Sequence, residues 1–248
     1  MHRFLKNNPK LESEKQKLSQ LQGKAKLQYI WDYYKLPILV VCVILYILGY
    51  TLYGHFSKKE ILLSAAFVNV APGEELTEQL SSGFLDNQNI SSNKNEVRLY
   101  TGLYLTDDEN DPNSQYVYAS RIKILGTIDS EELDVVFMNQ EAFDSFAQNG
   151  YLYNMEELLS QTDAALYREL SPFLCTNTEI LEDNADEVAF DDSIAYSAKT
   201  EEYPMVLKVS KSPLIQKAKM NGDIYLGIIG NTPHLETSIE YIRYLWDM

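Results

Sequence analysis

One long apolar run stands apart from the rest of this chain. Residues 36–57, LPILVVCVILYILGYTLYGHFS, carry no formal charge. An α-helix rises about 1.5 Å per residue, so a run of this length forms a helix of about 33 Å, enough to cross a hydrocarbon core of about 30 Å. Buried helices of soluble domains rarely stay apolar on every face for so long. The pattern therefore predicts one transmembrane helix over residues 36–57.

After this run, apolar positions alternate between the spacing typical of strands and that typical of helices. The predicted strands cover 61–70, 95–105, 133–138, 203–210 and 223–230. The predicted helices cover 74–85, 114–125, 140–150, 212–220 and 234–246. Strands and helices in this order indicate an α/β domain with a mostly parallel sheet and helices on both faces.

Two other segments have weaker patterns. Residues 152–170 predict short helical turns. Residues 187–200 contain two short runs around Asp191 and Asp192, which predict a hairpin. Pro204 is expected at the start of its strand, where a missing N–H is tolerated.

Charge is distributed unevenly and predicts the orientation of the chain. Residues 1–35 carry eight Lys or Arg against three Asp or Glu, whereas residues 60–248 carry 11 against 33. Because basic flanks stay in the cytoplasm, we expect a cytoplasmic juxtamembrane segment at 1–35 and an extracellular acidic domain at 58–248. The chain would then be a single-pass cell-membrane protein, with the lipid bilayer as its partner through residues 36–57.

A cleaved signal peptide is the alternative to this signal anchor. It requires a shorter leader, an apolar stretch of about 7–15 residues and a small-residue cleavage site. The best such site, Ser64-Ala65-Ala66, lies inside a predicted strand. The acidity of the outer domain also argues against a nucleic-acid partner, whose phosphates would repel it.

The sequence contains no recognisable catalytic or metal-binding constellation. Its two cysteines, Cys42 and Cys175, lie in the membrane run and the outer domain, so no disulfide framework is expected. The acidic loop 107–114 lacks the glycine and glutamate that a calcium loop of the EF-hand type requires. We therefore predict that the protein is not an enzyme and holds no cofactor or metal.

Asparagines stand at or near the ends of three predicted strands, in FVNVAPG, FMNQEAF and IIGNTPH. Ligands of open α/β sheets gather at the carboxyl ends of strands, near helix N-termini. The candidate ligand-binding residues are therefore Asn69, Asn139, Gln140, Asn231, Thr232 and His234. The alternative is helix capping, which suits Asn139 before Gln140 and Thr232 before Pro233.

Three segments carry a resemblance to a known family. LDVVFMNQEAFDSFAQNGYLYNMEELL, IYLGIIGNTPHLETSIEYIRYL and ILLSAAFVNVAPGEELTEQL resemble segments of the extracellular solute-binding proteins of bacterial ABC transporters. The resemblance implies one lobe of such a binding protein. It differs from the family in having too few residues for a full second lobe, so that lobe is expected to be reduced or absent, and in carrying a membrane helix in place of a lipidated cysteine.

Together these features predict a non-catalytic extracellular domain of a bacterial cell envelope, which binds a small polar solute or an envelope or transporter protein. A membrane-tethered accessory or sensor protein that acts by protein contact alone is the second hypothesis. An envelope hydrolase is the third.

Overall fold

The computed structural model describes residues 23–57, 59–108, 110–191 and 193–247. The side chains of residues 25–26, 29–30, 33–34 and 52–57 are not part of that description. The chain divides into two compact units, Met1–Lys58 and Lys59–Met248. Most of the predicted basic segment, residues 1–22, lies outside the described residues.

The first unit contains one long helix, α2 (Lys24–Ser57), with Pro37 inside it. Large apolar side chains between Leu36 and Tyr50 are exposed along this helix. No helix among the described residues is both long enough and apolar enough to span a membrane. Residues 52–57 of the predicted span belong to the part whose side chains are not described.

The second unit is built on one six-stranded sheet with the order β2-β1-β3-β6-β5-β4. The strands are β1 (Glu60–Val68), β2 (Asn95–Leu103), β3 (Val135–Met138), β4 (Leu174–Asp183), β5 (Ala198–Lys208) and β6 (Tyr225–Ile228). The α/β class is thus confirmed, and residues 59–248 form one compact unit on a single sheet.

The prediction of a mostly parallel sheet is wrong, because the sheet is mixed. β1 runs parallel to β2 and β3, whereas β6 is antiparallel to β3 and β5, and β4 is antiparallel to β5. Apolar alternation reports which faces of a strand are buried and contains no information about strand direction. β4 and β5 follow one another along the chain, and the segment with a short helix that joins them reverses the chain direction, so they pair antiparallel.

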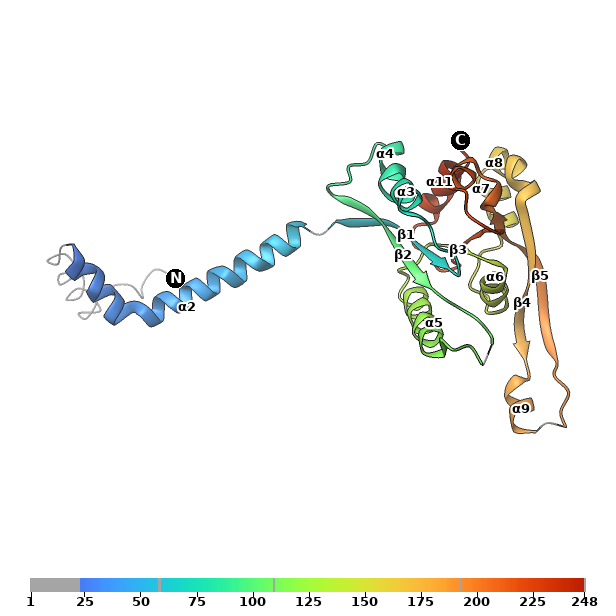
Figure 1. Cartoon of the computed structure of the whole chain (residues 1–248), viewed down its shortest axis with the longest axis horizontal. Coiled ribbons are helices and arrows are strands. Elements are labelled where there is room, and N and C mark those ends of the chain that lie inside the picture. Colours follow the sequence, from blue (N-terminus) through green and yellow to red (C-terminus); the bar gives the residue numbers. More distant parts are fainter. Residues whose placement is uncertain (1–22, 58, 109, 192, 248) are drawn as a thin grey trace, which may run out of the picture. The chain divides into compact units, whose positions relative to one another are not determined.

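Helices cover both faces of the sheet, as predicted (Figure 1). Successive residues of β1 point to opposite faces: Phe67 belongs to one apolar cluster, and Ala66 and Val68 to the other. The Phe67 face packs against α3 (Glu74–Glu78), η1 (Gln79–Gly83), α4 (Phe84–Asn87), α7 (Met155–Thr162), α8 (Ala164–Leu170), α10 (Pro213–Lys217) and α11 (Leu235–Leu245). The opposite face packs against α5 (Ser114–Asp129) and α6 (Gln140–Gln148).

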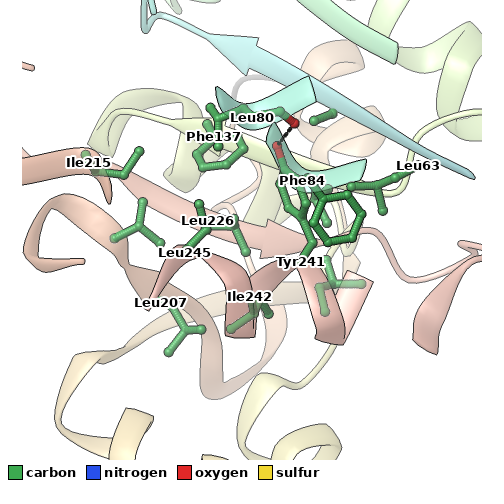
Figure 2. Packing of buried hydrophobic residues seen from close by; sticks show 14 of the residues in the cluster. Leu63, Leu80, Phe84, Phe137, Leu207, Ile215, Leu226, Tyr241, Ile242 and Leu245 are labelled. Atoms are coloured by element: carbon green, nitrogen blue, oxygen red, sulfur yellow. Dashed lines mark hydrogen bonds between the residues drawn. The ribbon is translucent and has the colours of Figure 1, made fainter. Parts of the chain in front are cut away.

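The larger cluster centres on Tyr241 of α11, which is fully buried (Figure 2). Its ring meets Phe84 edge-on, with centroids 4.9 Å apart, and its hydroxyl donates to the Leu80 carbonyl at 2.8 Å. The Tyr244 hydroxyl donates to the neighbouring Gln79 carbonyl at 2.9 Å. Both acceptors lie in η1, a π-helical turn between α3 and α4, so α11 holds this irregular turn by two tyrosine hydroxyls.

A long arm projects from the sheet (Figure 1). It consists of the distal halves of β4 and β5 with α9 (Ala185–Phe190) between them. The predicted hairpin over 187–200 is therefore wrong. The first of its two predicted strands belongs to helix α9, and the second overlaps only the beginning of β5. Pro204 lies inside β5 and not at its start. It pairs with Thr176 of β4, next to a shift in the strand register between Cys175 and Thr176.

Candidate functional site

An open cleft of about 820 Å³ lies at the carboxyl ends of β1 and β3. Three of the predicted ligand-binding residues, Asn69, Asn139 and Gln140, line it. The remaining lining residues are Val70, Ala71, Gly73, Ala218, Lys219, Met220, Asn221, Gly222, Asp223 and Tyr225. Because β1 and β3 are parallel neighbours, the segments that follow them meet at one edge of the sheet, as the sequence predicts.

Asn69 holds this edge together through its side chain. Its backbone is in the left-handed region, with φ of 58°. Its Nδ2 donates to the Leu105 carbonyl at 2.7 Å, and its Oδ1 accepts from the Leu105 N–H at 2.8 Å. Asparagine tolerates this conformation better than most residues with a side chain. Asn69 therefore fixes the segment after β2 against the end of β1.

Asn139 both caps a helix and faces the cleft. Its Oδ1 accepts from the Ala142 N–H at 3.0 Å, which confirms the predicted cap of α6, and from Asn69 Nδ2 at 3.2 Å. These two bonds fix the orientation of the carboxamide. Within the described residues its Nδ2 donates to no protein acceptor, so this N–H₂ group is available to a ligand.

Gln140 is tied to its own helix. Its Nε2 donates to Asp144 Oδ1 at 2.8 Å, and the same oxygen accepts from Asn177 Nδ2 at 2.8 Å. The side chain is thereby held along α6, and its carboxamide oxygen remains as an acceptor at the rim of the cleft.

The opposite wall is the turn from α10 to β6. Lys219 and Gly222 adopt positive φ values of 52° and 80°, which fold residues 218–223 tightly against the cleft. Asp223 at the end of this turn accepts from Lys208 Nζ at 2.7 Å, and this contact raises the pKa of Lys208. Burial raises the pKa of the Tyr225 hydroxyl, which stays neutral near pH 7. Five lining residues, Asn69, Asn139, Gln140, Asn221 and Tyr225, have uncharged polar side chains, and two, Lys219 and Asp223, are charged.

The other three predicted residues do not join this cleft. Asn231, Thr232 and His234 follow β6, which is antiparallel to β3, so its carboxyl end lies at the opposite edge of the sheet. The predicted convergence of all six residues is wrong for this reason. Asn231 instead donates to the Ile128 carbonyl at 2.7 Å at the end of α5.

Asp134, which the sequence did not single out, organises this second edge. Its carboxyl group is 1% exposed and accepts from the Ser64 N–H at 2.6 Å, from the Thr232 hydroxyl, and from His234, whose Nδ1 lies 3.1 Å away. It thus joins β1 and β3 to the segment after β6. A carboxylate inside the apolar run LDVVFM was the available signal, because a buried charge requires several partners.

Thr232 does not cap a helix, contrary to its second predicted role. Its Oγ1 accepts from the His234 N–H at 3.0 Å, and α11 begins after His234 without a side-chain cap. Thr232 therefore shapes the turn that brings His234 to Asp134. Among the described residues, no group of three or more His, Cys, Asp or Glu is arranged to hold a metal ion.

No family model matches the sequence, and neither the curated proteins nor the solved structures include a significant match to it.

Proposed function

We propose that residues 59–248 form a non-catalytic binding domain that takes a small polar solute in the cleft between Asn139 and residues 218–223. One observation carries this proposal: Asn139 lines the cleft, two hydrogen bonds orient its carboxamide, and its nitrogen donates to no acceptor among the described residues. A donor held in this way costs little conformational entropy when a ligand arrives.

The chemistry of the lining favours an uncharged ligand. Asn139 Nδ2, the Gln140 carboxamide oxygen and the Tyr225 hydroxyl offer donors and acceptors, while Asp223 is paired with Lys208. Histidine and cysteine do not occur among the residues that line the cleft. These groups can fix the orientation of a polar solute but present no nucleophile paired with a base, which favours binding over catalysis. The resemblance to extracellular solute-binding proteins supports the same function.

The proposal includes a membrane anchor at residues 36–57, with the N-terminus in the cytoplasm and the binding domain outside the cell. The uncharged run and the basic residues before it support this topology. So does α2, whose apolar side chains from Leu36 to Tyr50 are exposed and require an apolar surrounding. Protease added to intact cells should digest the acidic domain and spare the basic tail; protection of the acidic domain would overturn the orientation.

Solute binding is tested on the purified unit 59–248, which has its own core. The protein is denatured, and the released small molecules are identified by mass spectrometry. A thermal-shift screen against sugars, amino acids and short peptides follows. A retained polar compound, or a higher melting temperature with one compound class, supports the proposal. If no compound is released and no class raises the melting temperature, the proposal is wrong.

A membrane-tethered accessory protein is the second candidate function. The observation that favours it is the arm of β4, α9 and β5, which carries exposed apolar side chains at its distal end. The two functions are compatible, because the arm and the cleft use different residues.

A further inference from the structure

The distal end of the arm concentrates exposed apolar side chains. Seven large hydrophobic side chains are exposed in the described part of residues 59–248, and four of them lie within residues 181–196. They are Leu181, Phe190, Ile194 and Tyr196. Phe190, the last residue of α9, is 94% exposed. Single exposed apolar residues are ordinary, but four within sixteen residues favour a contact surface at this end of the arm.

Hydrogen bonds give this end of the arm a defined shape. The Asn184 side chain donates to the Ala195 carbonyl at 3.0 Å and accepts from the Ser197 N–H at 2.7 Å. The Asp191 carboxylate accepts from the Ser193 N–H at 3.0 Å and from its hydroxyl at 2.7 Å. The apolar side chains are therefore presented on an organised loop, which lowers the entropic cost of docking.

The arm is also strongly acidic. Residues 179–202, which make up the arm, contain nine Asp or Glu and one basic residue, Lys199. Lys199 Nζ lies 3.7 Å from Glu182 Oε1, so the arm retains a large negative charge. The Ser193 hydrogen bonds lower the pKa of Asp191, which keeps it ionised in mildly acidic conditions.

We propose that the end of the arm, residues 181–191 and 193–196, docks onto a protein with a basic surface and an apolar pocket that receives the Phe190 side chain. Charge selects this occupant over the alternatives. An anionic lipid surface would repel the arm, and so would the identical arm of a second copy of this chain. A basic partner gains both from charge complementarity and from burial of the exposed aromatic ring.

Site-specific photo-crosslinking in cells that produce the full chain tests this proposal. Phe190 is replaced by p-benzoylphenylalanine, and Tyr118 on α5, which is 68% exposed, is replaced in the same way as a control. We expect a discrete protein adduct from position 190 and not from position 118. Sequencing of the crosslinked peptide should place the contact among Lys and Arg residues of the partner.

Charge variants test whether the arm's acidity selects the partner. Asp186→Lys with Glu187→Lys, both exposed on α9, should reduce the adduct at least tenfold, and Lys199→Glu should preserve it. Chain levels must match the wild type, and Asp186→Asn with Glu187→Gln serves as the milder variant if they do not. No adduct above the position 118 control would overturn the proposal. So would an adduct with lipid, with a second copy of this chain or with an acidic surface, or an adduct insensitive to charge reversal.

Discussion

Asn69 Nδ2 lies 3.2 Å from Asn139 Oδ1, and this contact joins the ends of two neighbouring parallel strands, β1 and β3. The same Asn139 oxygen caps α6 through the Ala142 N–H. One oxygen atom thus makes two structural contacts, and the amide nitrogen beside it has no protein acceptor among the described residues. The structural and the binding roles of Asn139 can therefore be separated by substitution, because only the oxygen is needed for the cap.

Asp134→Ala should destabilise the domain by about 3 kcal/mol, because the Ser64 N–H, the Thr232 hydroxyl and His234 would lose their shared acceptor in a buried site. Chemical denaturation of residues 59–248 measures the change. Thr232→Val removes one of these contacts together with the acceptor of the His234 N–H, and should cost about 1–2 kcal/mol. An Asp134→Ala loss no larger than that of Thr232→Val would contradict the central role given to this carboxylate.

Two glycine substitutions should change the free energy of unfolding in opposite directions. A Cβ on Gly227 of β6 would lie 2.7 Å from Leu152 Cδ2 and 3.2 Å from Val206 Cγ1, so Gly227→Ala should cost about 1–3 kcal/mol by overpacking. Gly126 lies inside α5, and a Cβ added there would meet no atom within 4 Å, so Gly126→Ala should add about 0.5–1 kcal/mol of stability. Urea unfolding of both variants checks the pair, and a neutral or favourable Gly227→Ala would refute the packing described for β6.

Much of this fold could be predicted from apolar periodicity. The strand at 133–138, its Asn139 cap and the end of its helix near Gly150 agree with the structure. β4 was missed because it is an edge strand in which every residue is half-buried or exposed, so LCTNTEILED shows no alternation. Strand direction was also misjudged, since pairing is decided by connections and not by local pattern.

The candidate site was predicted in part, for the same reason. Asn69, Asn139 and Gln140 follow parallel strands and do meet at one edge. Asn231, Thr232 and His234 follow the antiparallel β6, which no residue pattern in IIGNTPH reveals. The wall of the cleft formed by residues 218–223 was not predicted. Its shape depends on positive φ values in a segment whose sequence predicts the end of a helix.

Ionisation of Tyr203 at high pH should lower the stability of the domain. Burial and the nearby Glu179 carboxylate, which accepts from its hydroxyl, raise the pKa of Tyr203 above its ordinary value. A raised pKa means that the folded state holds this proton more tightly. The stabilisation is therefore complete below about pH 10, the ordinary tyrosine pKa, and is lost as pH rises above it.

Comparison with Tyr203→Phe isolates this contribution, because the other tyrosines titrate in both proteins. The difference in unfolding free energy between wild type and variant should be constant from pH 7 to 9 and shrink progressively from pH 10 to 11. Urea unfolding at each pH provides the values. A difference that stays constant throughout this range would contradict the assigned environment of Tyr203.

The most direct test of solute binding compares two variants of residues 59–248 by calorimetry with the compound released from the wild type. Asn139→Asp keeps the capping oxygen and removes the free amide donor; Asn231→Ala alters the opposite edge of the sheet. Asn139→Asp should bind at least about tenfold more weakly with unchanged unfolding free energy. Asn231→Ala should bind normally while losing about 1 kcal/mol of stability. Equal affinity of wild type and Asn139→Asp would contradict the proposed site.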